Sequence, residues 1–155
     1  MQIKPFLWFD YQAEEATNFY VSIFKNSRVL SIARYGEAGP GPKGSVMSVT
    51  FELAGLPFGA LNGGPLFKFN EAISLFVDCT TQEEVDELWA KLSADGQESR
   101  CGGLKDKYGL SWQIIPSVLM ELLGDKDAAK SARVMKAMLG MGKIDIAELK
   151  RAAEG

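Results

Sequence analysis

The side chains best suited to chemistry in this sequence are carboxylates, hydroxyls, amides and thiols, because histidine is absent. Histidine is the commonest general acid or base near neutral pH and a frequent ligand of zinc, nickel and iron. Its absence excludes a Ser-His-Asp or Cys-His mechanism and any histidine-bound metal. Any chemistry of this protein must therefore proceed without imidazole.

The remaining reactive groups stand in patterns that favour structural roles. Glu14-Glu15 and Glu83-Glu84 each fall in the first turn of an expected helix, where negative charge complements the helix dipole. Cys101 has basic neighbours, but no histidine is present to act as its base. We therefore expect the glutamates to stabilise helices and Cys101 to be a small, buried or half-buried residue.

The glycine-rich segment at residues 36–44 resembles a phosphate-binding loop only in composition. Pro40 and Pro42 have no backbone N–H to donate, and the spacing of neither GxGxxG nor a Walker motif is present. We expect a surface loop here.

Two parts of the chain repeat one pattern, a strand followed by a helix and further strands. Asp10 and Asp78, at the ends of the first strands, are 68 residues apart, and Tyr20 and Trp89, in the helices, are 69 apart. The modules also end alike, with Gly55-Leu56-Pro57-Phe58 matching the segment from Gly109 to Trp112 at a spacing of 54. Such a repeat predicts two supersecondary units of the same topology.

Hydrophobic periodicity places the elements of each unit. In the first module it predicts strands at about 3–9, 29–35, 47–53 and 57–62 and a helix at about 13–24. In the second it predicts strands at about 73–79 and 110–115, shorter strands between them, and a helix from a capping box at Thr81 to about residue 95. Apolar residues at 134–139 and a capping box at Asp145 predict helices in a tail that the first module lacks.

Size and composition limit the class of protein. The chain has 155 residues, 46% of them hydrophobic and 24% charged, with a net charge of −3. These values fit one soluble domain, and they argue against nucleic acid or a membrane as a partner. No secretory or membrane-spanning segment is evident, and the two cysteines fit a reducing compartment. We therefore expect a cytoplasmic protein.

Four segments of the sequence, at residues 7–20, 61–72, 101–113 and 133–146, carry phrases typical of one family. Through them the sequence resembles the PhnB-like branch of the vicinal-oxygen-chelate superfamily, which also contains glyoxalase and bleomycin-resistance proteins. Many members of the branch carry the label 3-demethylubiquinone-9 3-methyltransferase. The resemblance implies an α+β fold in which two βαβββ modules form an incompletely closed, eight-stranded, barrel-like sheet, usually in a homodimer. It covers a single domain at 1–155, with module one at about 1–65, module two at about 71–116 and a helical tail at about 117–155.

The resemblance does not carry the metal site of its metal-dependent relatives. Their ligands lie on the first and last strands of each module, which match positions near Pro5, Ala60, Ala72 and Gln113. Three of these side chains have no donor atom, so we expect no metal and no cofactor. A histidine and a tryptophan of the family pattern are also replaced, by Leu66 and Gly103. The first strand leads into residues 10–12 without the glycine-rich turn that binds S-adenosylmethionine in class I methyltransferases.

Strand alternation predicts which side chains line a ligand cleft. Gln113 points away from Trp112 and Ile114, which must lie under the helix that carries Val85 and Trp89. The same parity places Ser111 and Ile115 beside Gln113, and Ser74 and Phe76 on the adjacent strand, with residues 73, 75 and 77 toward the helix. We expect Asn62 at the mouth of the cleft with Trp8 and Phe69. Amides and hydroxyls without charge would suit a neutral, partly aromatic ligand.

The sequence thus predicts a protein that binds a small molecule without the usual metal site of its superfamily. The alternative is an enzyme of unknown substrate, of the glyoxalase or dioxygenase type or the methyltransferase that the family label describes. A scaffold subunit that uses the helical tail is a third interpretation.

Overall fold

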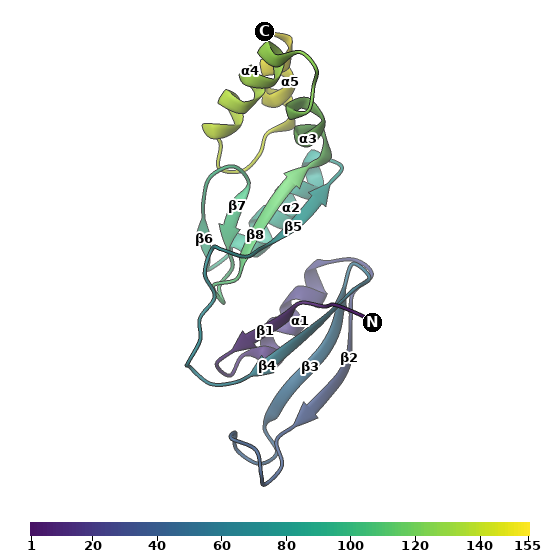
Figure 1. Ribbon diagram of the computed structural model, residues 1–155, viewed down its shortest axis with the longest axis vertical. Helices are drawn as coiled ribbons and strands as arrows, with labels where there is room; N and C mark the ends of the chain where they lie inside the picture. The colour runs from purple at the N-terminus through teal and green to yellow at the C-terminus, as the bar shows by residue number, and fades with distance from the viewer. The chain divides into compact units, whose positions relative to one another are not determined.

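A computed structural model describes residues 1–155 of the chain. The chain divides into two compact units, Met1–Phe69 and Asn70–Gly155. Each unit contains one four-stranded sheet with its own helix (Figure 1).

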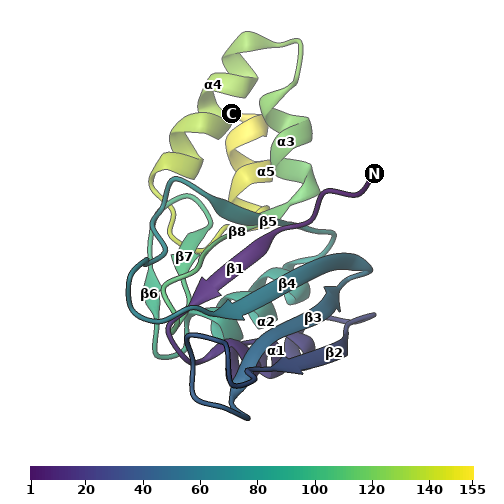
Figure 2. The same cartoon turned by 60° about the horizontal axis from the view of Figure 1, so that its bottom comes forward.

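The first unit is a βαβββ module. It consists of β1 (Phe6–Phe9), α1 (Ala13–Ile23), β2 (Arg28–Arg34), β3 (Val46–Leu53) and β4 (Leu56–Asn62). The strands lie in the order β1-β4-β3-β2, in which β1 runs parallel to β4 and the other pairs are antiparallel (Figure 2). Ala54 and Gly55 both have positive φ, 49° and 80°, which suits the two-residue turn that joins β3 to β4.

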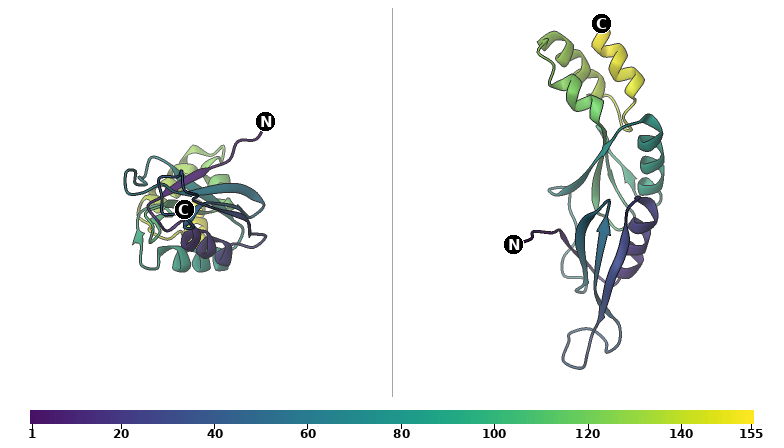
Figure 3. Two further views of the ribbon diagram at one scale, coloured as in Figure 1. Left: turned by 90° about the horizontal axis from the view of Figure 1, so that it is seen from below. Right: turned by 90° about the vertical axis from the view of Figure 1, so that its right-hand side faces the viewer.

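Alternation along β3 explains the core of the first unit. Val49, Phe51 and Leu53 are buried on the face that packs against α1, while the residues between them are half-buried. Tyr20 of α1 is fully buried, and the rings of Phe51 and Phe58 stack at a centroid distance of 5.4 Å. The helix therefore covers one face of the sheet, as the turned view shows (Figure 3).

The second unit repeats this topology. It consists of β5 (Ser74–Cys79), α2 (Gln82–Ser93), β6 (Gln97–Glu98), β7 (Gly103–Lys105) and β8 (Ser111–Pro116), in the sheet order β5-β8-β7-β6. The Thr81 hydroxyl accepts from the backbone N–H of Glu84 at 3.2 Å, as the capping box predicts. The Glu84 carboxylate accepts in return from the N–H of Thr80 at 2.8 Å.

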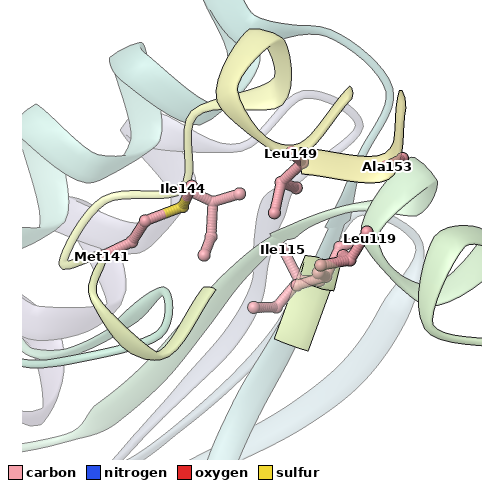
Figure 4. Close-up of a cluster of buried hydrophobic side chains, with 7 residues drawn as sticks. Ile115, Leu119, Met141, Ile144, Leu149 and Ala153 are labelled. Carbon is pink, nitrogen blue, oxygen red and sulfur yellow. The ribbon is translucent and has the colours of Figure 1, made fainter. Parts of the chain in front are cut away.

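Three helices follow β8 and complete the second unit. They are α3 (Ser117–Leu123), α4 (Ala128–Leu139) and α5 (Ile146–Glu154). The Asp127 and Asp145 side chains cap α4 and α5. Ile115 of β8 and Leu119 of α3 join residues from α4, α5 and the segment between these helices in one hydrophobic cluster (Figure 4). The members of this cluster are Ile115, Leu119, Val134, Met141, Ile144, Leu149 and Ala153.

These observations confirm the α+β class, the two βαβββ modules and the helical tail. Strands pair only within each four-stranded sheet, so no barrel closes through hydrogen bonds. None of the five helices has the length and apolar character needed to cross a membrane.

Candidate functional site

A hollow of about 290 Å³ lies in the second unit and is lined by residues from β5, β7 and β8. Trp112 and Ile114 of β8 are almost completely buried, at 2% and 0% exposure, and α2 packs against this strand. Gln113 between them faces the opposite side, where it lines the hollow together with Ser74 and Ser111. The structure therefore brings these three predicted residues together.

A direct hydrogen bond joins two of these side chains. Gln113 Nε2 donates to Ser74 Oγ at 2.7 Å. The Gln113 carbonyl oxygen Oε1 has no protein partner, and the Ser74 hydroxyl keeps its own hydrogen to donate. Ser111 is 6% exposed, and its hydroxyl forms no hydrogen bond within the protein. A buried hydroxyl without a partner is costly, so this wall of the hollow has unmet capacity for hydrogen bonds.

The hollow also contains charged side chains. Glu71, Arg100 and Lys105 line it with the polar residues of β5 and β8. Lys105 forms an ion pair with Glu71, and this hydrogen-bonded lysine holds the pKa of the Glu71 carboxyl below its usual value. Arg100 has no acidic partner in the structure. The expectation of a lining without charge is therefore wrong, because strand parity considers β5 and β8 alone, whereas the charges come from the segment before β5, the turn after β6, and β7.

The turn that carries Arg100 is attached to the helical tail. The backbone N–H groups of Cys101 and Gly102 donate to the carbonyls of Met141 and Gly142, each at 2.8 Å. On its other side, Gly102 accepts from the N–H of Ile114 at 2.7 Å. Cys101 and Gly102 both have positive φ, 56° and 80°. The segment between α4 and α5 therefore fixes the backbone next to Arg100 and links it to β8.

A buried carboxylate that sequence reasoning missed supports the same sheet. Asp106 is 3% exposed and accepts from Trp112 Nε1 at 2.9 Å through Oδ2. Its Oδ1 accepts from the N–H groups of Tyr108 and Leu110 at 2.9 and 3.1 Å. Asp106 thereby fixes the turn between β7 and β8 and the Trp112 ring behind Gln113. Its position in an Asp-Lys-Tyr-Gly turn is the one signal in the sequence that could have indicated this role.

Two residues predicted in the cleft lie elsewhere in the second unit. Phe76 is 51% exposed and does not line the hollow, although it is the β-sheet partner of Gln113. Ile115 is buried in the cluster with the helical tail, because these helices cover the end of its strand. Ile73 was expected to face the helix, but it precedes β5 and is 75% exposed.

The other predicted residues belong to the first unit, where each has local contacts. Trp8 Nε1 donates to the Gly64 carbonyl at 2.9 Å, and its ring meets Phe67 edge-on at a centroid distance of 5.0 Å. Phe69 packs in the same way on the ring of Phe9, at 5.2 Å.

Asn62 caps the start of α1 and lies in a separate hollow of about 470 Å³. Its Oδ1 accepts from the Ala13 N–H at 2.8 Å, and its Nδ2 donates to the Val46 carbonyl at 3.1 Å. Both functional groups of the amide are thus engaged within the first unit, which indicates a structural role for this side chain.

The glycine-rich loop packs around one aromatic ring of the first unit. Tyr35 is 8% exposed, and its hydroxyl donates to the Asn62 carbonyl at 2.5 Å. A Cβ added at Gly39 or Gly41 would lie 2.6 or 2.3 Å from this ring. The glycines are therefore required for close approach of the backbone to Tyr35, and their spacing reflects packing.

The residues of this chain do not fit the metal site of the metal-dependent superfamily members. Pro5, Ala60 and Ala72 have no donor atom, and Gln113 offers a single amide oxygen, which cannot hold a transition metal alone. The structure contains no group of three or more cysteine, aspartate or glutamate side chains placed to hold a metal ion.

The two βαβββ modules, each with a helix on one face of its sheet, define a fold of the vicinal-oxygen-chelate class. A family model described as 3-demethylubiquinone-9 3-methyltransferase matches residues 1–115, and the chain belongs to this family. The match ends before α3, so the three tail helices lie outside it. None of the curated proteins matches the chain.

Solved structures agree with this assignment. The chain is similar to a PhnB protein from Bacillus cereus, with 41% identity over 76% of this chain and 100% of that chain, and a TM-score of 0.70. It shares its fold with protein PA1353 from Pseudomonas aeruginosa, at 18% identity over 75% and 97% of the two chains and a TM-score of 0.62. The fosfomycin resistance protein FosX from Listeria monocytogenes also shares the fold, at 17% identity over 81% and 98% and a TM-score of 0.60.

Proposed function

We propose that this protein binds a small molecule in the hollow of its second unit, without a bound metal. The observation that carries this proposal is the incomplete hydrogen bonding of the Gln113 side chain. It is half-buried, one of its N–H groups is held by the Ser74 hydroxyl at 2.7 Å, and its carbonyl oxygen remains free to accept from a ligand. A purely structural glutamine would direct both ends of its amide to the protein, as Asn62 does.

The polar groups around Gln113 support the same proposal. Ligand sites combine an enclosed surface with a few polar groups that fix the orientation of the ligand. Here the amide of Gln113, the hydroxyls of Ser74 and Ser111, and the cations of Arg100 and Lys105 line one hollow. The fixed turn at Cys101–Gly102 and the buried Asp106 hold the surrounding backbone in place, which reduces the entropic cost of binding.

Methyl transfer, the reaction in the family's name, is the alternative. It requires S-adenosylmethionine as a second ligand, so binding of this compound distinguishes the two functions. We expect no binding of S-adenosylmethionine, because the first strand is followed by residues 10–12 without a glycine-rich turn.

A thermal-stability screen of small aromatic compounds, with S-adenosylmethionine included, tests the proposal. Wild-type protein is compared with Gln113→Leu and with Gln2→Leu, a control in which an exposed amide of the first unit is removed. A ligand at about 100 times its Kd stabilises the folded state by about 2.7 kcal/mol. We expect ligands that raise the Tm of the wild type and of Gln2→Leu to lose most of this effect with Gln113→Leu. Equal stabilisation of all three proteins would place the ligand elsewhere, and stabilisation by S-adenosylmethionine would favour methyl transfer.

A further inference from the structure

The hollow of the second unit carries more positive than negative charge, although the protein as a whole is acidic. The chain has a net charge of −3. The ionisable groups that line the hollow are two cations, Arg100 and Lys105, one carboxylate, Glu71, and the thiol of Cys101. The local excess of positive charge therefore belongs to this surface and does not reflect the overall composition.

Only one of the two cations has an acidic partner within the protein. Lys105 is already paired with Glu71, whose side chain is 67% exposed. Arg100 has no partner, although its guanidinium offers five donors in a geometry that matches a carboxylate. Lys105 is the sheet partner of Ser111, which in turn is the partner of Ser74, so the three side chains form one row across β7, β8 and β5. Lys105 and the two serines thus face the same side of the sheet.

On the basis of the proposed function, we propose that the ligand of this hollow is an organic anion with a carboxylate-like group. The acidic group binds Arg100 and replaces Glu71 as the partner of Lys105. The rest of the ligand meets the Gln113 carbonyl, and an acceptor atom at the wall gives the buried Ser111 hydroxyl the partner that the protein does not supply.

The energetics favour this exchange. An exposed ion pair such as Lys105–Glu71 contributes little net stability, so its replacement by a ligand carboxylate has a small cost. A hydrogen bond to a charged group is stronger than one between neutral groups, and the Arg100 guanidinium has no partner within the protein to give up. Glu71 therefore acts as a competitor for the acidic group of the ligand. Removal of the Arg100 charge should therefore weaken binding of the ligand, whereas removal of the Glu71 charge should strengthen it.

Matched pairs of compounds provide the probe. Benzoate with benzamide, and phenylacetate with phenylacetamide, differ in charge and hardly in shape. Titrations of 15N-labelled protein follow the backbone amides of Gly103, Ser111 and Gln113, which report on the hollow. The proteins compared are the wild type, Arg100→Gln, Glu71→Gln and, as a control for net charge, Lys150→Gln, which removes an exposed cation of α5.

We expect the carboxylates to shift these amides and to bind at least about tenfold more tightly than the carboxamides. Arg100→Gln should weaken carboxylate binding by about tenfold. Glu71→Gln should strengthen it about two- to fivefold, because Lys105 is released. Lys150→Gln should leave both affinities unchanged, and none of the substitutions should change carboxamide binding.

Three results would overturn the inference. If carboxamides bind the hollow as tightly as carboxylates, a small-molecule site remains but its ligand is not an anion. An equal loss of affinity with Lys150→Gln and Arg100→Gln would show a general effect of charge and no specific contact. If no compound of either kind shifts the three amides, the inference and the proposed function both fail.

Discussion

Substitution of Gly102 by alanine should destabilise the second unit strongly, because the backbone of this residue connects β8 to the segment between α4 and α5. Its φ of +80° is a conformation that alanine rarely adopts. A Cβ at this position would lie 2.7 Å from Ile115 Cδ1, 2.8 Å from the Ile114 carbonyl oxygen and 3.2 Å from Ile144 Cγ1. The carbonyl oxygen cannot move freely, since β8 is held in the sheet. Gly102 therefore offers no low-energy way to accommodate a methyl group.

The expected magnitude combines two effects. A left-handed backbone costs an L-residue about 1–2 kcal/mol. Overpacking of a filled site adds about 1–3 kcal/mol. We therefore expect Gly102→Ala to lower the free energy of unfolding of the second unit by about 2–5 kcal/mol. Gly109 provides a matched control, since its φ is +86° but nothing lies within 4 Å of an added Cβ. Gly109→Ala should show the backbone cost alone, about 1–2 kcal/mol.

Urea denaturation followed by tryptophan fluorescence measures both variants. A Trp8→Phe background restricts the signal to Trp89 and Trp112, which lie in the second unit. We expect Gly102→Ala to lower the free energy of unfolding more than Gly109→Ala does, by about 1–3 kcal/mol. Equal losses in the two variants would refute the claim that Gly102 is packed between β8 and the segment between α4 and α5.

Four further predictions concern single side chains. Asp106→Ala should cost about 3 kcal/mol in urea denaturation, because it leaves buried N–H donors without an acceptor, and a loss below about 1 kcal/mol would contradict that role. Burial raises the pKa of the Cys79 thiol to about 11, so a thiol reagent at pH 8 should label Cys101 in the folded protein and Cys79 only after unfolding; equal rates would show that Cys79 is accessible. In the unfolded chain this thiol ionises with its ordinary pKa of 9.0, while in the folded protein it keeps its proton, so the free energy of unfolding should fall between pH 9 and 11. An equally steep fall for a Cys79→Ala variant would refute this. Asp127→Ala should destabilise the tail by about 1 kcal/mol through loss of the α4 cap, whereas Asp127→Asn should retain most of the stability that the cap contributes. Thermal denaturation of the two variants measures this difference.

The repeat and the hydrophobic periodicity predicted most of the fold. The helix predicted at about 13–24 is α1 at Ala13–Ile23, and the last strand lies at Ser111–Pro116 in place of 110–115. The helix α3 was not predicted, because Pro116 indicated only the end of a strand, and whether a chain continues as a helix depends on what it packs against.

The spacing of the repeat was less well defined than the pattern itself. Leu7 pairs with Ala60, but Leu75, which lies 68 residues after Leu7, pairs with Trp112, only 52 residues after Ala60. The predicted spacings of 68 for the first strands and 54 for the last strands therefore cannot both hold. Similar residue types in two strands do not define their register, because hydrogen bonds between strands set it.

The candidate site shows the same limit. Alternation along one strand placed Ser111 and Gln113 on one face, and the parallel partner strand added Ser74. The charges of Arg100 and Glu71 could not be predicted in this way, because they reach the hollow from segments whose positions depend on tertiary contacts. The contact of Cys101 and Gly102 with the tail joins residues about 40 positions apart, and no local pattern indicates it.

A crystal structure of the protein with a bound aromatic carboxylate tests the central claim most directly. The account predicts ligand density in the hollow of the second unit, with the acidic group at Arg100 and another ligand atom within hydrogen-bond distance of Gln113 or Ser111. Ligand density in the hollow of the first unit, beside Asp10 and Tyr35, with only water in the hollow of the second unit, would contradict this prediction.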